Sequence, residues 1–269
     1  ALTSVQQAER ARRWGWWYQA EWRLLGMKAY WTSVVGSAVL TPLLYVLAMG
    51  IGLGALVDAS TGGVSGVPYL TFVAPGLLVS TVVMSAANEL MFPVMDGFKW
   101  GKAYYARGAT AASSMQVAAG ELVAVAIRML AEAALFWLIL VLLGATTLGW
   151  SVVMIPVAAL AGMAFGAPLL AFSATLEEEG FEFSMIQRFV VMPMFLFAGT
   201  FYPLETMPLY LQWIGWISPM WHGTQLARLA SFGLPLPGWQ VALHLGFLLV
   251  LLGVGTVLAM RNFTRRLAK

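Results

Sequence analysis

Six long apolar stretches constrain the fold of this chain more than any other feature. They occupy residues 30–56, 69–94, 115–143, 152–176, 185–202 and 241–260. A helix needs about twenty apolar residues to cross a hydrocarbon core of ~30 Å, because it rises about 1.5 Å per residue. The sequence therefore predicts an all-α polytopic membrane protein, with six transmembrane helices in a single transmembrane domain over residues 1–269.

Composition excludes several other classes of protein. The chain is 60% hydrophobic and only 10% charged, contains no cysteine and has two histidines. These residues supply neither a disulfide framework nor a thiolate or histidine metal cluster, so no metal site is expected. The net charge of +3 comes from basic residues at the ends of the apolar stretches, which membrane topology explains better than nucleic-acid binding.

The basic residues alternate between connections and so predict orientation. They precede the first stretch, join the second to the third, open the fifth and end the chain: Arg10, Arg12, Arg13, Arg23 and Lys28; Lys99, Lys102 and Arg107; Arg188; Arg261, Arg265, Arg266 and Lys269. Only Arg228 falls on the other side. The positive-inside rule then predicts a multi-pass protein of the cytoplasmic (inner) membrane with both termini in the cytoplasm.

The segment before the first stretch, residues 4–25, has the pattern of an amphipathic helix. Trp14, Tyr18 and Trp22 share one arc, and Gln19 and Arg23 lie nearly opposite. Such a helix lies in the membrane interface. It is either a membrane anchor alone or an anchor whose polar face also contacts a cytosolic partner.

The cytoplasmic loop over residues 96–112 combines aromatic and basic side chains. A short helix across the membrane surface would direct its aromatic residues to membrane or protein and its cations to water and lipid phosphate. The aromatic residues are Phe98, Trp100, Tyr104 and Tyr105, and the cations include Lys99, Lys102 and Arg107. The loop is either an interfacial anchor or a docking element for a cytosolic subunit.

Charged residues within the apolar stretches require partners, because an unpaired ion in lipid costs several kcal/mol. Glu121, Arg128 and Glu132 are spaced seven and four apart, so they share one face of the third helix. Arg128 can pair with Glu132, and our hypothesis is that it also reaches Glu89 on the second helix. These residues form either a structural network of intramembrane ion pairs or part of a coupling or transport mechanism.

The stretch over residues 189–221 breaks at 200–203 and then remains aromatic and aliphatic. Pro203, Pro208 and Pro219 do not fit within one helix. Residues 203–238 are therefore expected to form short helices that re-enter the bilayer from the outer side.

No nucleotide-binding or catalytic motif is present. The chain has no Gly-x-x-x-x-Gly-Lys-Ser/Thr loop, and no pairing of a nucleophile with a base. The chain is therefore not expected to be an enzyme. If ATP drives its function, another chain must bind the nucleotide.

Three segments carry a resemblance to a known family: "YLTFVAPGLLVSTVVMSAANE" at 69–89, "KAYYARGATAASSMQVAAGEL" at 102–122 and "MPMFLFAGTFYPLETMPLYLQWIGWISPMWHGTQLAR" at 192–228. The chain resembles membrane subunits of type-2 ABC exporters, in the branch of nodulation-factor and actinomycete antibiotic-resistance export permeases. The resemblance implies a homodimer of permeases, two ATP-binding cassette subunits that hold ATP and Mg, and no cofactor in this chain. Its "RGATAASS" departs from the pattern of many relatives, which have a proline after the threonine.

The resemblance also implies roles for particular segments. Residues 4–25 would be the connecting helix, residues 98–107 the coupling helix seated on the ATPase, and the break near residue 200 the start of the outer gate. The expected cargo is hydrophobic or amphipathic, such as a drug, a glycolipid or a lipid-linked saccharide. Bulky residues of the fifth stretch would contact this cargo or form the gate, or would simply pack or face lipid: Met192, Phe195, Phe197, Phe201 and Tyr202.

Two alternatives remain open at this stage. A proton-coupled secondary carrier would use Glu89, Glu121, Arg128 and Glu132 as a relay, although the sequence shows no convincing internal repeat. A scaffold subunit without transport would leave the aromatic loop and the outer segment without a purpose.

Overall fold

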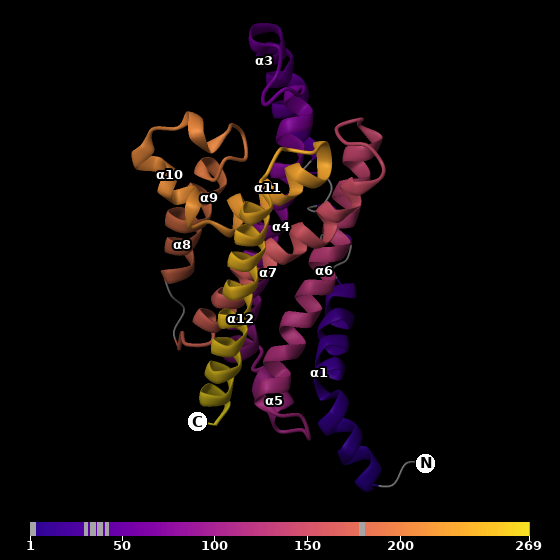
Figure 1. Cartoon of the computed structure of the whole chain (residues 1–269). Coiled ribbons are helices and arrows are strands. Elements are labelled where there is room, and N and C mark those ends of the chain that lie inside the picture. Colours follow the sequence, from indigo (N-terminus) through magenta and orange to yellow (C-terminus); the bar gives the residue numbers. More distant parts are fainter. Residues whose placement is uncertain are drawn as a thin grey trace.

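The computed structural model describes residues 4–29, 43–177 and 181–268, together with Thr32, Gly36 and Leu40. Within these residues the regular structure is helical, apart from one isolated bridge between Val64 and Val67. Most long helices run along a common direction and form an elongated bundle (Figure 1). The predicted all-α class is confirmed.

Five helices of the described residues are long and apolar enough to cross a membrane. They are Leu43–Thr61, formed by η1 (Val46–Leu53) and α3 (Gly54–Thr61); Tyr69–Trp100, formed by α4 (Tyr69–Met95) and η2 (Asp96–Trp100); α6 (Ser114–Leu142); Trp150–Ser173, formed by η3 (Trp150–Val153) and α7 (Met154–Ser173); and α12 (Gly238–Leu267). They correspond to five of the six predicted spans. Most of the predicted first span before Leu43 lies outside the described residues.

The predicted fifth span, 185–202, is not one of these five helices. Its residues form α8 (Glu182–Ile186), η4 (Gln187–Val191) and α9 (Met192–Phe197), of 5, 5 and 6 residues. Together they reach about 24 Å, less than the ~30 Å core. The helix ends early because Gly199 adopts the left-handed conformation at φ 73°. The described residues thus do not reach the predicted count of six.

Beyond this break the chain forms the predicted short helical pieces. They are η5 (Leu204–Thr206), α10 (Leu209–Trp216) and α11 (Pro219–Phe232). Pro208 precedes α10, and Pro219 is the first residue of α11, where a missing backbone N–H costs nothing. Whether these pieces re-enter the bilayer stays a prediction.

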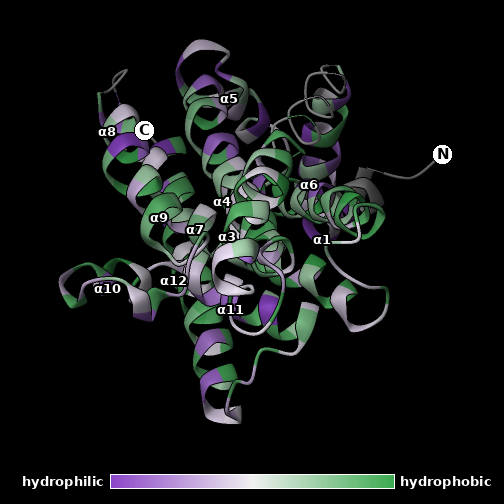
Figure 2. Ribbon diagram, turned by 90° about the horizontal axis from the view of Figure 1, so that it is seen from above, coloured by the Kyte–Doolittle hydropathy of each residue, from purple (hydrophilic) through white to green (hydrophobic). Residues whose placement is uncertain are grey.

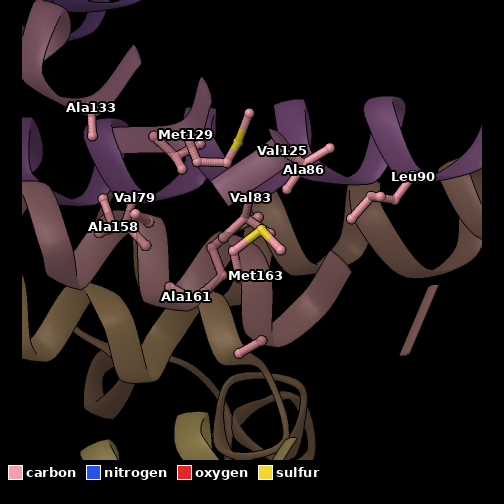
Figure 3. Packing of buried hydrophobic residues seen from close by; sticks show 14 of the residues in the cluster. Val79, Val83, Ala86, Leu90, Val125, Met129, Ala133, Ala158, Ala161 and Met163 are labelled. Carbon is pink, nitrogen blue, oxygen red and sulfur yellow. The ribbon is translucent and has the colours of Figure 1, made fainter. Parts of the chain in front are cut away.

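Helix α4 lies at the centre of the bundle, packed against α6, α7 and α11. Small residues allow this packing: Gly162 of α7 faces the Val82 side chain, and Gly166 faces Leu90 and Ala86. Figure 3 shows the alanine, valine and methionine side chains of α4, α6 and α7 that fill the remaining space. The close approach of these helices positions the polar groups described below.

The outer surface of the bundle is apolar. Figure 2 shows that hydrophobic residues make up most of the helices, and on α12 the side chains of Leu249, Val250, Val254 and Val257 are all exposed. Such a surface suits lipid rather than water. The start of α1 (Ser4–Lys28), the short helix α5 (Ala103–Gly108) and the end of α12 lie at one end of the molecule, and α3 and α11 lie toward the other (Figure 1).

Candidate functional site

Helix α1 packs along α6, and part of its polar face contacts other helices of the same chain. Trp14, Tyr18 and Trp22 are exposed, whereas Gln19 is buried and the Arg23 side chain is only 15% exposed. Of the two roles left open by the sequence, contact of the polar face with a cytosolic partner is not supported for these two residues, because both contact their own chain. The reason lies on α6, where Gly120 leaves room for the α1 backbone beside Gln19.

Five charged residues join α1, the loop, α4 and α6; Glu89, Arg107 and Glu121 are buried, and Arg23 and Arg128 are half-buried. The Arg107 guanidinium lies 2.6 Å from Glu121, and Arg23 lies 3.2 Å from Glu121 and 2.9 Å from Glu89, which also pairs with Arg128. We call this set, Arg23, Glu89, Arg107, Glu121 and Arg128, the inner charge cluster. Positive and negative groups alternate along it, which offsets the cost of burying each ion.

The structure agrees with the sequence hypothesis for Arg128 and Glu89, but not with the pairing of Arg128 and Glu132. It brings Arg128 and Glu89 together, and it connects Glu121 to α1 and the loop. Glu132 accepts a hydrogen bond from the Ser85 hydroxyl at 2.7 Å. Across the described residues, no ion pair joins Arg128 to Glu132, the pair that their spacing allowed. A partner on α4 satisfies each residue instead.

The loop predicted over 96–112 folds as η2 and α5, and part of its aromatic set is internal. The ring of Phe98 lies 4.7 Å from that of Tyr104 and 4.9 Å from that of Phe263 of α12, and Arg266 lies 4.0 Å above it. Burial, with the neighbouring Glu121 carboxylate, raises the pKa of Tyr104 well above its ordinary value. The expectation that Phe98 and Tyr104 face membrane or partner is therefore wrong.

The position of Arg107 also differs from the prediction for this loop. It was expected to reach water and lipid phosphate, but it is buried, ion-paired to Glu121 and hydrogen-bonded to the side chain and backbone of Gln19. The Glu121 carboxylate and the α1 backbone provide these partners, which the loop sequence does not reveal.

The remaining aromatic and basic side chains of the loop point outward. Trp100 and Tyr105 are 52% and 42% exposed, and Lys102 is also exposed. Lys102 adopts a left-handed conformation at φ 50° between η2 and α5, so the chain turns there. We call Trp100, Lys102 and Tyr105 the loop face. A cavity of about 500 Å³ adjoins it and extends to Glu177 and Arg266.

The five predicted gate residues do not form one group. Phe195 and Phe201 lie with ring centroids 5.2 Å apart, and Tyr45 adds a third ring 5.6 Å from Phe195. Tyr202 donates from its hydroxyl to the Leu196 carbonyl at 2.9 Å. Met192 is exposed and Phe197 half-buried. The aromatic cluster of Tyr45, Phe195 and Phe201 therefore joins the first span to the break after α9.

Arg228 fixes this break to α4, and the sequence interpretation missed it. Arg228 is 2% exposed. Its guanidinium donates hydrogen bonds to the Gly199 and Thr200 carbonyls at 2.8 and 3.1 Å and to the Phe72 carbonyl at 3.3 Å. It also lies 3.7 Å from the centre of the Phe72 ring. The Thr200 hydroxyl is also 2.9 Å from that of Ser80. The rarity of arginine among apolar residues was the available signal.

The fold and site define a class of protein, an integral membrane protein. The inner charge cluster and an exposed aromatic loop lie at one end, and the break after α9, which Arg228 bonds to α4, lies toward the other end. The chain belongs to the ABC-2 type transporter family, whose model matches residues 18–232.

Curated relatives agree with this family. Nodulation protein J of Rhizobium leguminosarum bv. viciae is 26% identical, over 93% of this chain and 95% of the relative. Nodulation protein J of Sinorhizobium fredii is 28% identical over 96% and 95%, and that of Rhizobium meliloti 28% identical over 87% of each. The chain is thus the membrane subunit of an ABC exporter, a class in which a separate subunit carries the ATPase.

Proposed function

We propose that this chain pairs with a second copy of itself, and with two ATP-binding cassette subunits, to export a hydrophobic or amphipathic cargo across the cytoplasmic membrane. ATP and Mg are held by the partner subunits, and both termini of the permease lie in the cytoplasm. The loop face, α5 and the end of α12 then meet the ATPase side, and the break after α9 lies at the outer side. The distribution of basic residues supports this orientation.

The observation that carries the proposal is the division of the loop into a buried half and an exposed half. Phe98, Tyr104 and Arg107 attach the loop to α12, α1 and α6, and Trp100 and Tyr105 present rings outward. Exposed aromatic side chains are typical anchors of protein interfaces. A movement of the docked ATPase would therefore displace the loop together with these helices as a rigid unit.

The inner charge cluster extends this connection to α4. Arg23 bridges Glu121 on α6 and Glu89 on α4, and Glu89 in turn binds Arg128. Because each carboxylate is shared by two guanidinium groups, moving one helix alone would leave a buried ion without a partner. We assign the cluster a structural coupling role.

The cargo class rests on the surroundings of the fifth segment. An apolar cavity of about 710 Å³ lies between α7, α9, α10 and α12, with Phe189, Met194 and Trp213 among its lining residues. Apolar, aromatic and methionine side chains suit a hydrophobic or amphipathic molecule. We retain Met192, Phe195, Phe197, Phe201 and Tyr202 as pathway or gate residues, with the Phe195 and Phe201 pair as the gate itself.

The test is purification in mild detergent from the native membrane, with identification of co-purifying chains and an ATPase assay. We expect an ATP-binding chain to accompany the native protein, and Trp100→Ala with Tyr105→Ala to lose it or uncouple its ATPase. Trp150→Ala is the matched control, because Trp150 is 84% exposed at the start of η3, far from the loop, and lines neither the apolar cavity nor the cavity beside the loop.

Two outcomes would contradict the proposal. The first is a loop variant that retains its partner and full cargo-stimulated ATPase activity. The second is a permease that purifies alone and moves cargo with a proton gradient, which would favour the secondary carrier. The pairing of Glu89 and Glu121 with arginines favours a structural network over that relay, since each carboxylate is already shared by two guanidinium groups.

A further inference from the structure

A third cavity, of about 820 Å³, lies at the opposite end of the molecule from the inner charge cluster. Its walls come from η5, α10, α11 and the first turns of α12, which meet near the end where α11 is labelled in Figure 1. It shares none of its lining residues with the gate residues or with the apolar cavity beside α9. Nothing in the proposed export mechanism uses it.

Tryptophan side chains supply the apolar part of this cavity. Trp216 at the end of α10 and Trp239 at the start of α12 both line it and are 48% and 65% exposed. Two large, accessible indole rings at the edge of one cavity provide flat apolar surfaces on which a ligand can lie.

The contacts of His222 and His244 in the cavity wall determine which ring nitrogens of these two histidines carry a proton. His222 Nε2 lies 2.9 Å from the Trp216 carbonyl, which accepts only, so this nitrogen carries a proton. His222 Nδ1 lies 2.7 Å from His244 Nδ1, and one of the two must donate. With His222 neutral, its Nδ1 accepts from His244, and the remaining nitrogen of His244, Nε2, is an acceptor.

The other polar groups offer both donors and acceptors without a strong net charge. Gln225 and Gln240 line the cavity, and each amide provides an N–H donor and a carbonyl acceptor. The carboxylate in the wall, Glu205, is exposed to solvent and interacts electrostatically with the buried Arg228 guanidinium. Lysine and arginine are absent from the residues that line the cavity in the described structure.

These groups together select a class of ligand. A phosphate or carboxylate would find no cation in the wall, and a purely apolar molecule would leave the amides and the imidazole unpaired. A sugar has hydroxyl groups that both donate and accept, and an apolar face formed by its C–H groups. We propose that this cavity is a binding site for a neutral saccharide unit, with Trp216 and Trp239 against its apolar face and Gln225, Gln240 and His244 bonded to its hydroxyls.

The saccharide can be free or can be the headgroup of a lipid, and the two share the chemistry that the cavity recognises. The inference goes beyond the proposed export function, because it concerns binding at a place separate from the gate. It is tested without ATP, a partner subunit or transport, so its failure would leave the export proposal intact.

The experiment measures binding to the purified permease by saturation-transfer NMR. The protein is prepared in a polyoxyethylene detergent, because alkyl glycoside detergents carry the proposed ligand. Cellobiose is the free probe, and octyl glucoside below its micelle concentration is the lipid-like probe. We expect saturable binding in the millimolar range, weakened about tenfold by Trp239→Ala and by Gln240→Ala, which remove one aromatic face and one hydrogen-bonding amide.

Trp150→Ala is the matched control and should bind both probes like the native protein, because Trp150 is exposed at the start of η3 and lines neither this cavity nor the apolar cavity. Equal binding of both probes supports a free sugar, and binding of octyl glucoside alone supports a lipid-borne sugar. Three results would overturn the inference: no saturable binding of either probe, equal binding in Trp239→Ala and Trp150→Ala, or displacement of the sugar by tetramethylammonium at lower concentration, which would mark a cation site.

Discussion

Glu121→Gln tests whether the inner charge cluster holds α1 and the loop to the bundle. Glu121 is 1% exposed and contacts two guanidinium groups, Arg107 at 2.6 Å and Arg23 at 3.2 Å. The neutral amide keeps the shape of the side chain but removes the countercharge and places an N–H group beside cations. Glu121 makes as many contacts in the cluster as Glu89 does, and it is the more deeply buried of the two carboxylates.

The magnitude follows from these contacts. A hydrogen bond to a charged group contributes about 1.5–3 kcal/mol, and removing one partner of a buried ion pair costs about 3–5 kcal/mol. For a chain of this size each kcal/mol lowers the melting temperature by about 2–4 °C. We therefore expect Glu121→Gln to lower the Tm by about 10 °C.

The assay is thermal unfolding of the purified protein in one detergent at one scan rate, because unfolding of membrane proteins is often irreversible. Glu132→Gln is the control on the same helix. Its carboxylate is also buried, but the amide can still accept the bond from the Ser85 hydroxyl, so the Tm should fall by about 2 °C or less. Equal Tm changes in the two variants, or no change in Glu121→Gln, would refute the reasoning.

Three further predictions concern other contacts. Glu89→Gln and Arg128→Met should show a coupling of at least about 1 kcal/mol in a double-mutant cycle of unfolding, and additive effects would contradict their pairing. Arg228→Lys should destabilise the protein by about 2–4 kcal/mol, at least as much as Arg228→Met. Lysine keeps a buried charge but loses the planar guanidinium and its contact with the Phe72 ring. Native stability of the lysine variant would show that charge alone suffices. Phe201→Ala removes the partner of the Phe195 ring and should change cargo transport about threefold to tenfold with assembly intact; unchanged transport of every tested cargo would count against the gate.

Helix positions could be predicted from the sequence because apolar length determines them directly. The second and third spans, predicted at 69–94 and 115–143, are observed at Tyr69–Trp100 and Ser114–Leu142. The fifth was predicted too long because its aromatic and apolar residues continue past Gly199, where the backbone turns. Hydropathy does not register a single left-handed residue.

The site could be predicted only in part. The spacing of the intramembrane charges and the aromatic character of the loop identified the right residues. The two short helices of the loop, η2 and α5, have too few turns for periodicity to show which side is buried. Phe98, Tyr104 and Arg107 face inward because of Phe263, Glu121 and α1, which are distant in sequence. Arg228 was missed since its partners are backbone carbonyls, which no side-chain pattern reveals.

The inner charge cluster and the contacts of Arg228 at the break after α9 are both attached to α4, and this has a mechanical consequence. The break after α9 is bonded to the first half of the helix, through the Phe72 carbonyl, the Ser80 hydroxyl and the Tyr69 hydroxyl, and the inner charge cluster is bonded to its second half through Glu89. The residues from Tyr69 to Glu89 span about 30 Å of continuous helix. A rigid displacement of α4 thus moves the inner charge cluster, which holds the loop, together with the break after α9. The exception is a bend of the helix at Pro75, which lies between the contacts of Phe72 and Ser80.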